Sequence, residues 1–418
     1  MNELCTSSTP ISNFGLPSAD RTRWANAQSS DILGIWTWRR HFHRVHGPAF
    51  GRRQMEMSNS PITPTPSTRF FMPKLNKLNV AGFNLLEALS TPVKPVALSA
   101  DQLELCKNAV RQMREKLQSR GSRSQIDKEF DSLMTDRSSS HLLNLKTNAA
   151  LYVNNIGKNR YANVLPYDDN RVTLTNNYSG DYINASFITG QGLEDLPVYI
   201  ATQGPLRTTM NDFWEMVLQE RCPVIIMLTV LMDGSQDKCY SYFPSVLNQP
   251  EQYGRLCVTT KFEDNVWHNS VVKRVFEIRN LSEPGATPHN VLHLEYLDWP
   301  DFGAPASTGP VRDMIRTLQF IPVNAGPFVV HCSAGIGRTG TYCAIDHTLR
   351  RIINGDLTAV EIWQSINNFR GQRYGMVQTR DQLRFCYEAV CDELEDLIAS
   401  NQMQSDHKVK SQHRLSGP

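Results

Sequence analysis

Hydrophobic positions in this chain show two different periods, one helical near residue 100 and one of short apolar runs further along. Ser99 precedes Gln102 by three residues, which is the capping-box spacing that begins a helix. Apolar residues then recur on one helical face, at Leu103, Cys106, Val110, Met113 and Leu117. A helix that packs against a core is therefore expected to begin at residue 100.

The middle of the chain is typical of strands, with helical patterns on either side. Short apolar or alternating runs predict strands at residues 182–188, 198–201, 223–231, 256–262, 271–278, 291–296 and 327–331. Helical patterns cover residues 212–218, 338–353, 358–369 and 381–399, with Thr358 and Glu361 as a second capping box. We therefore predict an α/β (α+β) domain, with a highly twisted mixed sheet flanked by helices.

Both ends of the chain lack such periods. Residues 1–97 are rich in Ser, Thr, Pro and Arg, which predicts a disordered basic tail, and residues 401–418 predict a second disordered tail. The ordered domain is then expected at residues 98–400. For the basic segment, a solvated tail, a translation start at Met57 and a transit peptide remain open alternatives.

Composition excludes several classes of protein. The net charge of +2 gives no electrostatic basis for nucleic-acid binding. The longest apolar run, residues 224–232, is much shorter than the roughly 20 residues of a membrane-spanning helix, so we expect no membrane span. The 9 cysteines show no C-x-x-C spacing, which favours reduced thiols, no zinc site and a cytoplasmic protein, with the nucleus left open.

Candidate chemistry lies where the run 327–331 ends. Cys332 begins a loop of small residues and Arg338 begins a helix. Such a loop turns successive backbone N–H groups toward one anion, and the helix N-terminus adds its positive end. The loop residues expected to bind the anion are Ser333, Ala334, Gly335, Ile336 and Gly337. The same field favours a thiolate on Cys332, with Arg338 holding two phosphoryl oxygens and Thr339 hydrogen-bonded to the sulfur. The alternative is that Cys332 is only a core cysteine.

A thiolate that attacks a phosphate ester also needs an acid for the leaving oxygen. Asp301 is the candidate, because it follows Trp299 and Pro300 in a loop that Gly303 lets move. An ordinary turn aspartate is the alternative.

These motifs together resemble those of the tyrosine-specific protein phosphatases, most closely the soluble plant-type enzymes. The resemblance rests on residues 158–161 (KNRY), 181–186 (DYINAS), 202–205 (TQGP), 212–214 (DFW), 299–303 (WPDFG), 331–340 (HCSAGIGRTG) and 378–382 (QTRDQ). It implies a single phosphatase domain that needs no metal or other cofactor, with phosphotyrosine proteins such as mitogen-activated kinases as substrates.

The resemblance also implies roles for individual residues. Cys332 is then the nucleophile, Arg338 the phosphate clamp and Asp301 the acid and later the base. Gln378 positions the hydrolytic water, with Gln382 nearby, and Tyr161 stacks on the substrate ring as the wall of a deep cleft.

Two positions depart from the family pattern. Asn163 replaces an aspartate that grips the substrate backbone in many relatives, and Asp233 stands where a glutamate often supports the arginine clamp. We expect weaker peptide anchoring from the first departure and weaker support of Arg338 from the second.

Two other functions share part of this pattern. A phosphotyrosine-binding module without activity would lack the acid, the nucleophile or the clamp, and a dual-specificity or phosphoinositide phosphatase would lack the Tyr161 wall. We also expect peroxide to oxidise Cys332 before other thiols, with Cys343 and Cys222 as alternative resolving partners.

Overall fold

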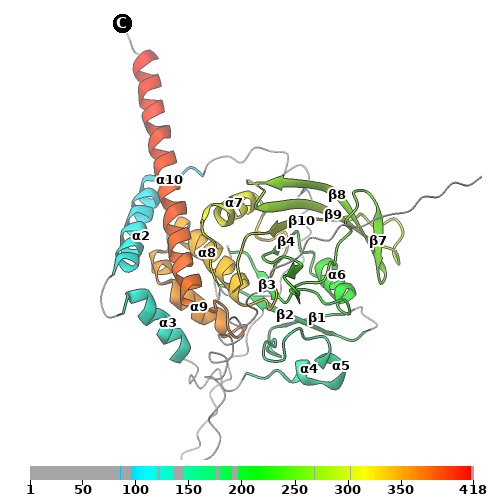
Figure 1. Cartoon of the computed structure of the whole chain (residues 1–418). Helices are drawn as coiled ribbons and strands as arrows, with labels where there is room; N and C mark the ends of the chain where they lie inside the picture. Colours follow the sequence, from blue (N-terminus) through cyan, green and yellow to red (C-terminus); the bar gives the residue numbers. More distant parts are fainter. Residues whose placement is uncertain are drawn as a thin grey trace, which may run out of the picture. The chain divides into compact units, whose positions relative to one another are not determined.

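A mixed nine-stranded sheet forms the centre of the part of the chain that the computed structural model describes, which is residues 85, 96–119, 123–135, 145–175, 179–190, 196–267, 269–301 and 303–415 (Figure 1). Its strand order is β1-β2-β3-β11-β4-β10-β9-β8-β7. The strands are β1 (Arg171–Thr173), β2 (Tyr182–Ile188), β3 (Tyr199–Thr202), β4 (Val224–Met227), β7 (Pro250–Tyr253), β8 (Leu256–Val266), β9 (Val271–Asn280), β10 (His289–Tyr296) and β11 (Phe328–His331). Most of the segment 1–97 that we predicted to be disordered lies outside the described residues.

The four central strands are parallel and the outer ones antiparallel. In β11, Val329 lies opposite Ile200 of β3 on one side and Ile225 of β4 on the other. All four residues of β11 are buried, as are those of β3 and β4. Strands covered on both faces read as continuous apolar runs, which is why the sequence shows no alternation here.

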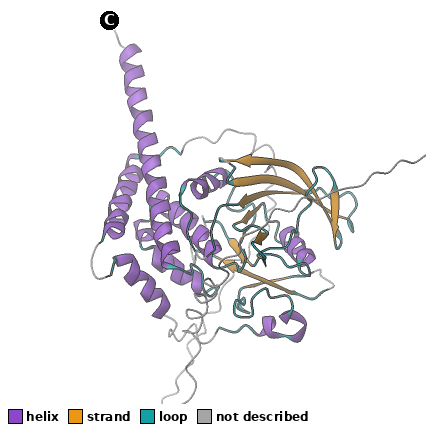
Figure 2. Cartoon of the chain, viewed as in Figure 1, coloured by secondary structure: helices purple, strands orange, loops and turns teal. Residues whose placement is uncertain are grey.

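Helices cover both faces of the sheet (Figure 2). Successive side chains of a strand point to opposite faces, so Phe328 and Val330 pack into one apolar layer and Val329 into the other. The first layer is closed by α2 (Ala100–Gln118), α7 (Gly309–Leu318), α8 (Gly337–Ile353) and α10 (Arg380–Leu415). The second is closed by α6 (Met210–Gln219), which buries Trp214. The predicted α/β domain with a mixed sheet is confirmed.

Several smaller elements were not predicted. They are α3 (Gln125–Thr135), α4 (Asn148–Leu151), α5 (Val153–Ile156) and the hairpin strands β5 (Met232–Asp233) and β6 (Gln236–Asp237). The helix predicted at residues 358–369 is present as the 3₁₀ turn η4 (Leu357–Val360) followed by α9 (Ile362–Arg370). In α3 the buried apolar residues Ile126, Phe130 and Leu133 form only a narrow stripe among polar neighbours. Such a stripe is easily missed in a polar stretch.

The two predicted capping boxes had different outcomes. At α2 the Ser99 side chain accepts from Gln102 N at 3.2 Å, and the Gln102 side chain accepts from Ser99 N at 2.9 Å, as predicted. The box at Thr358 is wrong, because Asp356 caps this turn by accepting from Thr358 N at 2.9 Å. Glu361 is instead committed to an ion pair with Lys116.

Helix α10 continues to Leu415, whereas the sequence predicted a disordered tail from residue 401. Residues 401–415 lack an apolar stripe but contain many good helix formers, so a helix already formed by packing continues through them. Its 36 residues are rich in charge, and none of the described helices is long and apolar enough to cross a membrane.

An ion triad of buried Lys116 and Glu129 with half-buried Glu361 joins α2, α3 and the segment before α9. Lys116 Nζ lies 3.0 Å from Glu129 Oε1 and 2.8 Å from Glu361 Oε1. The second oxygen of each carboxylate is also bonded, since Tyr387 OH donates to Glu129 at 2.6 Å and Trp363 Nε1 donates to Glu361 at 3.0 Å. The ammonium therefore offsets the charge of two carboxylates that bridge three elements.

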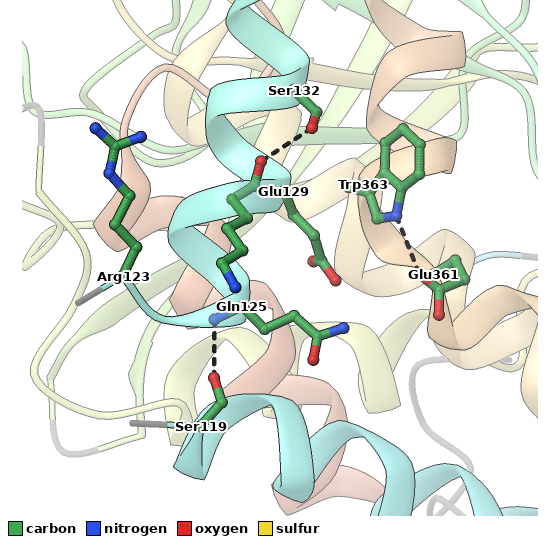
Figure 3. A pocket seen from close by; sticks show the side chains of 8 residues that line it. Ser119, Arg123, Gln125, Glu129, Ser132, Glu361 and Trp363 are labelled. Atoms are coloured by element: carbon green, nitrogen blue, oxygen red, sulfur yellow. Dashed lines mark hydrogen bonds between the residues drawn. The ribbon is translucent and has the colours of Figure 1, made fainter. Parts of the chain in front are cut away.

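The two carboxylates of this triad line a cavity of about 420 Å³ (Figure 3). In Figure 3 Glu129 and Glu361 lie on facing elements, and Gln125 N donates to Ser119 Oγ at 2.8 Å at the start of α3. Its lining contains no cysteine, so we assign it no chemistry.

We expect Lys116→Met to lower the free energy of unfolding by about 3 kcal/mol, because two carboxylates would lose their cation. Urea unfolding followed by tryptophan fluorescence measures the change. Lys107→Met on the same helix is the matched control, since that lysine is 43% exposed and its partner Glu104 is 67% exposed. The control should change the free energy by less than about 0.5 kcal/mol. Equal losses in the two variants would contradict the prediction.

Candidate active site

Cys332 follows β11 directly and lies under the loop that leads into α8. Only 5% of its surface is exposed, and Gly335 N donates to its Sγ at 3.2 Å. Gly335 has φ +72°, and a Cβ at this position would lie 2.1 Å from the Thr202 carbonyl oxygen. Only glycine fits both the backbone angle and this close approach. The predicted strand, loop and helix are therefore present in that order.

The carbonyls of the loop are all bonded from outside. His331 O accepts from Leu228 N at 2.8 Å, Ser333 O from Gly204 N at 2.9 Å and Ile336 O from Val377 N at 3.1 Å. The Arg373 guanidinium donates to Gly335 O at 2.8 Å and to Ala334 O at 3.1 Å. Because these carbonyls face outward, the N–H groups between them can face the cavity, which is the arrangement of an anion-binding nest.

Arg373 is fully buried behind this loop. Its guanidinium also donates to Asn184 Oδ1 at 2.8 Å, so β2 holds it in place. Burial lowers the pKa of Arg373 to about 10, which still leaves a cation at neutral pH. Arg370 holds the next segment by donating to the carbonyls of Met376 and Val377 at 2.9 and 2.6 Å. Two cations therefore hold the Cys332 loop and the segment that precedes Gln378 from behind.

His331 is a neutral structural side chain. It is fully buried, and burial lowers its pKa to about 4. Its Nδ1 lies 3.3 Å from Cys332 O, and its Nε2 lies 2.8 Å from Tyr242 OH, which is 2.9 Å from His293 Nε2. Since a carbonyl only accepts, His331 Nδ1 carries the proton and its Nε2 accepts from Tyr242. This chain of hydrogen bonds fixes the backbone at the nucleophile.

A cavity of about 210 Å³ opens above Cys332. Its lining includes most of the residues that the sequence singled out: Tyr161, Asn163, Asp301, Cys332, Ser333, Ala334, Arg338, Gln378 and Gln382. Lys238 and Val164 also line it and were not predicted as site residues. The sequence around Lys238 shows no motif that marks it as a site residue, because only the folded chain brings the β5–β6 hairpin to the cavity. No group of three or more His, Cys, Asp or Glu side chains in the described part of the chain could hold a metal ion.

Asp301 lies between two cations. It forms ion pairs with Arg338 and Lys238, and Arg338 Nη1 donates to Leu228 O at 3.0 Å. Asp233 is exposed on the β5–β6 hairpin and lines a neighbouring cavity that Arg338 shares. Among the described residues, the groups that accept hydrogen bonds from Arg338 are Asp301 and the Leu228 carbonyl rather than Asp233.

Tyr161 stands at the wall of the cavity, with its hydroxyl 2.9 Å from Ser333 Oγ. The segment that bears it is fixed on both sides. Lys158 Nζ lies 2.9 Å from Asp212 Oδ2, and Arg160 donates to the carbonyls of Gly204 and Pro205 at 3.0 and 2.8 Å. The sequence motif at residues 158–161 therefore contacts the motifs at residues 202–205 and 212–214 in the folded chain.

The other predicted site residues divide into two groups. Gln378 lies so close to the loop that a Cβ on Gly337 would approach its Oε1 to 2.4 Å, and Gln378 N donates to Gln382 Oε1 at 2.8 Å. Gly335, Ile336 and Gly337 belong to the loop but do not line the cavity. Thr339 Oγ1 is buried without a hydrogen-bond partner in the structure, so its predicted bond to the Cys332 sulfur is not formed here.

A cysteine, an arginine and an aspartate thus meet at one cavity, in the combination of residues that a phosphatase needs. The profile of the protein-tyrosine phosphatase family matches residues 155–392, and the chain belongs to this family. It is 44% identical over 321 residues to protein-tyrosine-phosphatase PTP1 of Arabidopsis thaliana, which covers 76% of this chain and 92% of that protein. It is 40% identical over 247 residues to tyrosine-protein phosphatase non-receptor type 20 of Rattus norvegicus, covering 59% of this chain and 56% of that protein.

We expect Gly335→Ala to reduce the hydrolysis of para-nitrophenyl phosphate by about 100-fold or more, because the added Cβ displaces the loop against Thr202. Gly254→Ala is the matched control, since Gly254 also has positive φ (+61°) but its nearest atom lies at 3.7 Å. The control should keep most of the activity despite a similar backbone cost. Steady-state kinetics measure the activity of both variants, and circular dichroism verifies that both are folded. Equal activities would contradict the prediction.

Proposed function

We propose that this protein-tyrosine phosphatase hydrolyses phosphotyrosine in proteins through a cysteinyl-phosphate on Cys332. The observation that carries the proposal is the meeting of Cys332, Arg338 and Asp301 at one cavity whose loop is bonded from outside. A binding module without activity would not need all three. A dual-specificity enzyme would not need the Tyr161 wall.

In the first step the Cys332 thiolate attacks phosphorus, so that an S–P bond forms and the P–O bond to tyrosine breaks. Asp301 gives its proton to the tyrosine oxygen, which leaves as neutral tyrosine. Arg338 and the N–H groups of residues 333–337 hold the phosphoryl oxygens throughout and stabilise the charge of the transition state. These groups make a metal unnecessary for the charge.

Substrate binding exchanges one ion pair for another. Arg338 contacts Asp301 in the empty cavity and would contact the phosphoryl group in the complex. Asp301 is then released from Arg338, so its carboxyl can approach the leaving oxygen that the first step requires it to reach. Binding thereby prepares the acid.

In the second step a water molecule attacks the cysteinyl-phosphate, the S–P bond breaks and the thiolate leaves. Asp301 accepts a proton from the water, and Gln378 orients it, with Gln382 holding the backbone of Gln378 at 2.8 Å. Thr339 would donate to the leaving thiolate after a rotation about χ1, since its buried hydroxyl has no other partner in the structure. Phosphate and the free enzyme are the products.

Tyrosine selectivity comes from the depth of the cavity. The Tyr161 ring, fixed by its bond to Ser333, can stack on the ring of a phosphotyrosine, while Asn163 lies at the same side. A phosphoserine side chain would be too short to bring its phosphorus to Cys332. Mitogen-activated kinases are the substrates that the sequence resemblance favours, and we propose that the enzyme acts on them in the cytoplasm.

We expect Asp301→Ala to lower kcat on a phosphotyrosine peptide by about two to four decades with little change in KM, because only the leaving oxygen loses its acid. Cys332→Ser is the matched variant that removes the nucleophile and should leave no measurable turnover. Mass spectrometry of proteins retained by Asp301→Ala then identifies substrates. Equal losses in binding and turnover would show that Asp301 is structural, and retention of no mitogen-activated kinase would refute that substrate.

We also expect hydrogen peroxide to inactivate the enzyme at Cys332, reversibly by dithiothreitol after brief exposure. Burial raises the pKa of the Cys106 thiol to about 11 and that of Cys391 to about 12, and it raises those of Cys222 and Cys343 further, so these thiols stay protonated. Vanadate should protect by filling the loop. Peptide mapping that found a different cysteine oxidised first would refute this redox assignment and leave the hydrolytic mechanism intact.

A further inference from the structure

Four large apolar side chains lie exposed on one short segment, α4–α5. They are Leu151, Tyr152, Val153 and Ile156, with 58, 66, 83 and 57% of their surfaces exposed, and we call them the apolar patch. Isolated exposed apolar residues are ordinary, whereas a contiguous group marks an interaction surface. Residues 147–157 contain no Asp, Glu, Lys or Arg, so their own segment offers no charged group to a partner.

The exposure of the patch is imposed by a fixed backbone. Ala150 and Asn155 are buried, and Asn155 Nδ2 donates to Ala149 O at 2.7 Å. Asn159 Nδ2 donates to Ala150 O at 3.1 Å and to Asn155 O at 3.2 Å, which closes the turn onto the next segment. The patch residues are those that this turn leaves pointing outward. They are therefore held ready for contact rather than ordered by it, which lowers the entropy cost of binding.

A short hydrogen-bonded segment joins the patch to the wall of the candidate active site. Asn159 Oδ1, which anchors the turn, also accepts from Tyr182 OH at 2.5 Å and from Asn184 Nδ2 at 3.0 Å. Tyr161 follows it by two residues and bonds to Ser333. The five residues from Ile156 to Tyr161 can span at most about 18 Å, and an extended substrate peptide has the same reach per residue. Asn163 and Val164, which line the cavity near Tyr161, are also uncharged. The two cations of the connecting segment are already bonded, Lys158 to Asp212 and Arg160 to the carbonyls of Gly204 and Pro205.

We infer that the apolar patch is a specificity site for the substrate chain, and that it binds an aliphatic or aromatic side chain within about six residues of the phosphotyrosine. The inference rests on the proposed function, since it places the phosphotyrosine in the cavity beside Tyr161. Contact with an apolar side chain removes apolar surface of both partners from water. A charged side chain would lose hydration on the patch and find no opposite charge there. The enzyme therefore selects apolar rather than acidic or basic flanking residues at this side of the cavity.

The test compares phosphotyrosine peptides that carry Leu or Ser at one position, scanned over six positions on each side, with the full chain as enzyme. We expect Leu to raise kcat/KM about 10-fold at one or two positions, equivalent to about 1.4 kcal/mol. In the variant Val153→Ser/Ile156→Ser this ratio should fall to about 2 or less. Hydrolysis of para-nitrophenyl phosphate, which has no flanking residues, should be unchanged in the variant.

Leu281→Ser is the matched control, because Leu281 is a 48% exposed leucine just beyond the end of β9. At that end of the sheet β10 starts with His289 opposite Ile278, whereas the other end of β10 leads to Asp301. The control should keep the 10-fold ratio. The inference is overturned if the Leu-to-Ser ratio of kcat/KM is near 1 in the unmutated enzyme, or if it stays near 10 in Val153→Ser/Ile156→Ser. Continued hydrolysis of para-nitrophenyl phosphate would in either case leave the proposed function unaffected. Light scattering supplies a further outcome that overturns the inference. If the unmutated protein is a dimer and Val153→Ser/Ile156→Ser is a monomer, a second copy of the chain occupies the patch.

Discussion

The structure of this phosphatase depends on one constraint, which is that every carbonyl from His331 to Ile336 must be bonded from outside the loop. A loop whose N–H groups face a common point leaves its carbonyls on the far side, where they are buried and need donors. The donors come from backbone N–H groups of Leu228, Gly204, Gly340 and Val377, from the His331 ring and from Arg373. Leu228, Gly204 and the segment of Arg373 and Val377 are distant from the loop in sequence, so the anion site exists only when these three segments have assembled around it.

This requirement explains why so many polar residues are buried around the sheet. Arg373 must be buried to reach two carbonyls, and a buried guanidinium needs further acceptors, which Asn184 and Ser186 of β2 provide. Asn184 in turn donates to Asn159 beside the aromatic wall. The polar contacts behind the loop therefore also set the position of Tyr161, so the loop and the aromatic wall share one support.

The sequence predicts the parts of the fold that carry strong periods and the parts of the site that carry dense motifs. The apolar runs gave the central strands, because buried parallel strands show uninterrupted apolar sequence. The loop from Cys332 to Arg338 could be predicted, because a run of small residues between a strand and a helix is typical of an anion-binding loop. The role of Lys238 could not be predicted, because only the folded chain brings its hairpin to the cavity. The Asp356 cap could not be predicted either, because Glu361 forms an ion pair with Lys116 instead of the expected capping box. Thr339 shows the opposite error, a contact expected from its position that the packed hydroxyl does not make.

The ion pair between Asp301 and Arg338 has a consequence for what the empty cavity admits. A ligand must replace a carboxylate that already holds the arginine, so its binding free energy is a difference between two ion pairs rather than the full strength of one. A singly charged anion only replaces one ion pair of Arg338 with a similar one, so its binding free energy is small. A doubly charged phosphoryl group keeps the arginine and still has charge to place on the loop amides and the helix end. The resting pair thus acts as a valence filter, which excludes the common monoanions of the cell without a steric barrier.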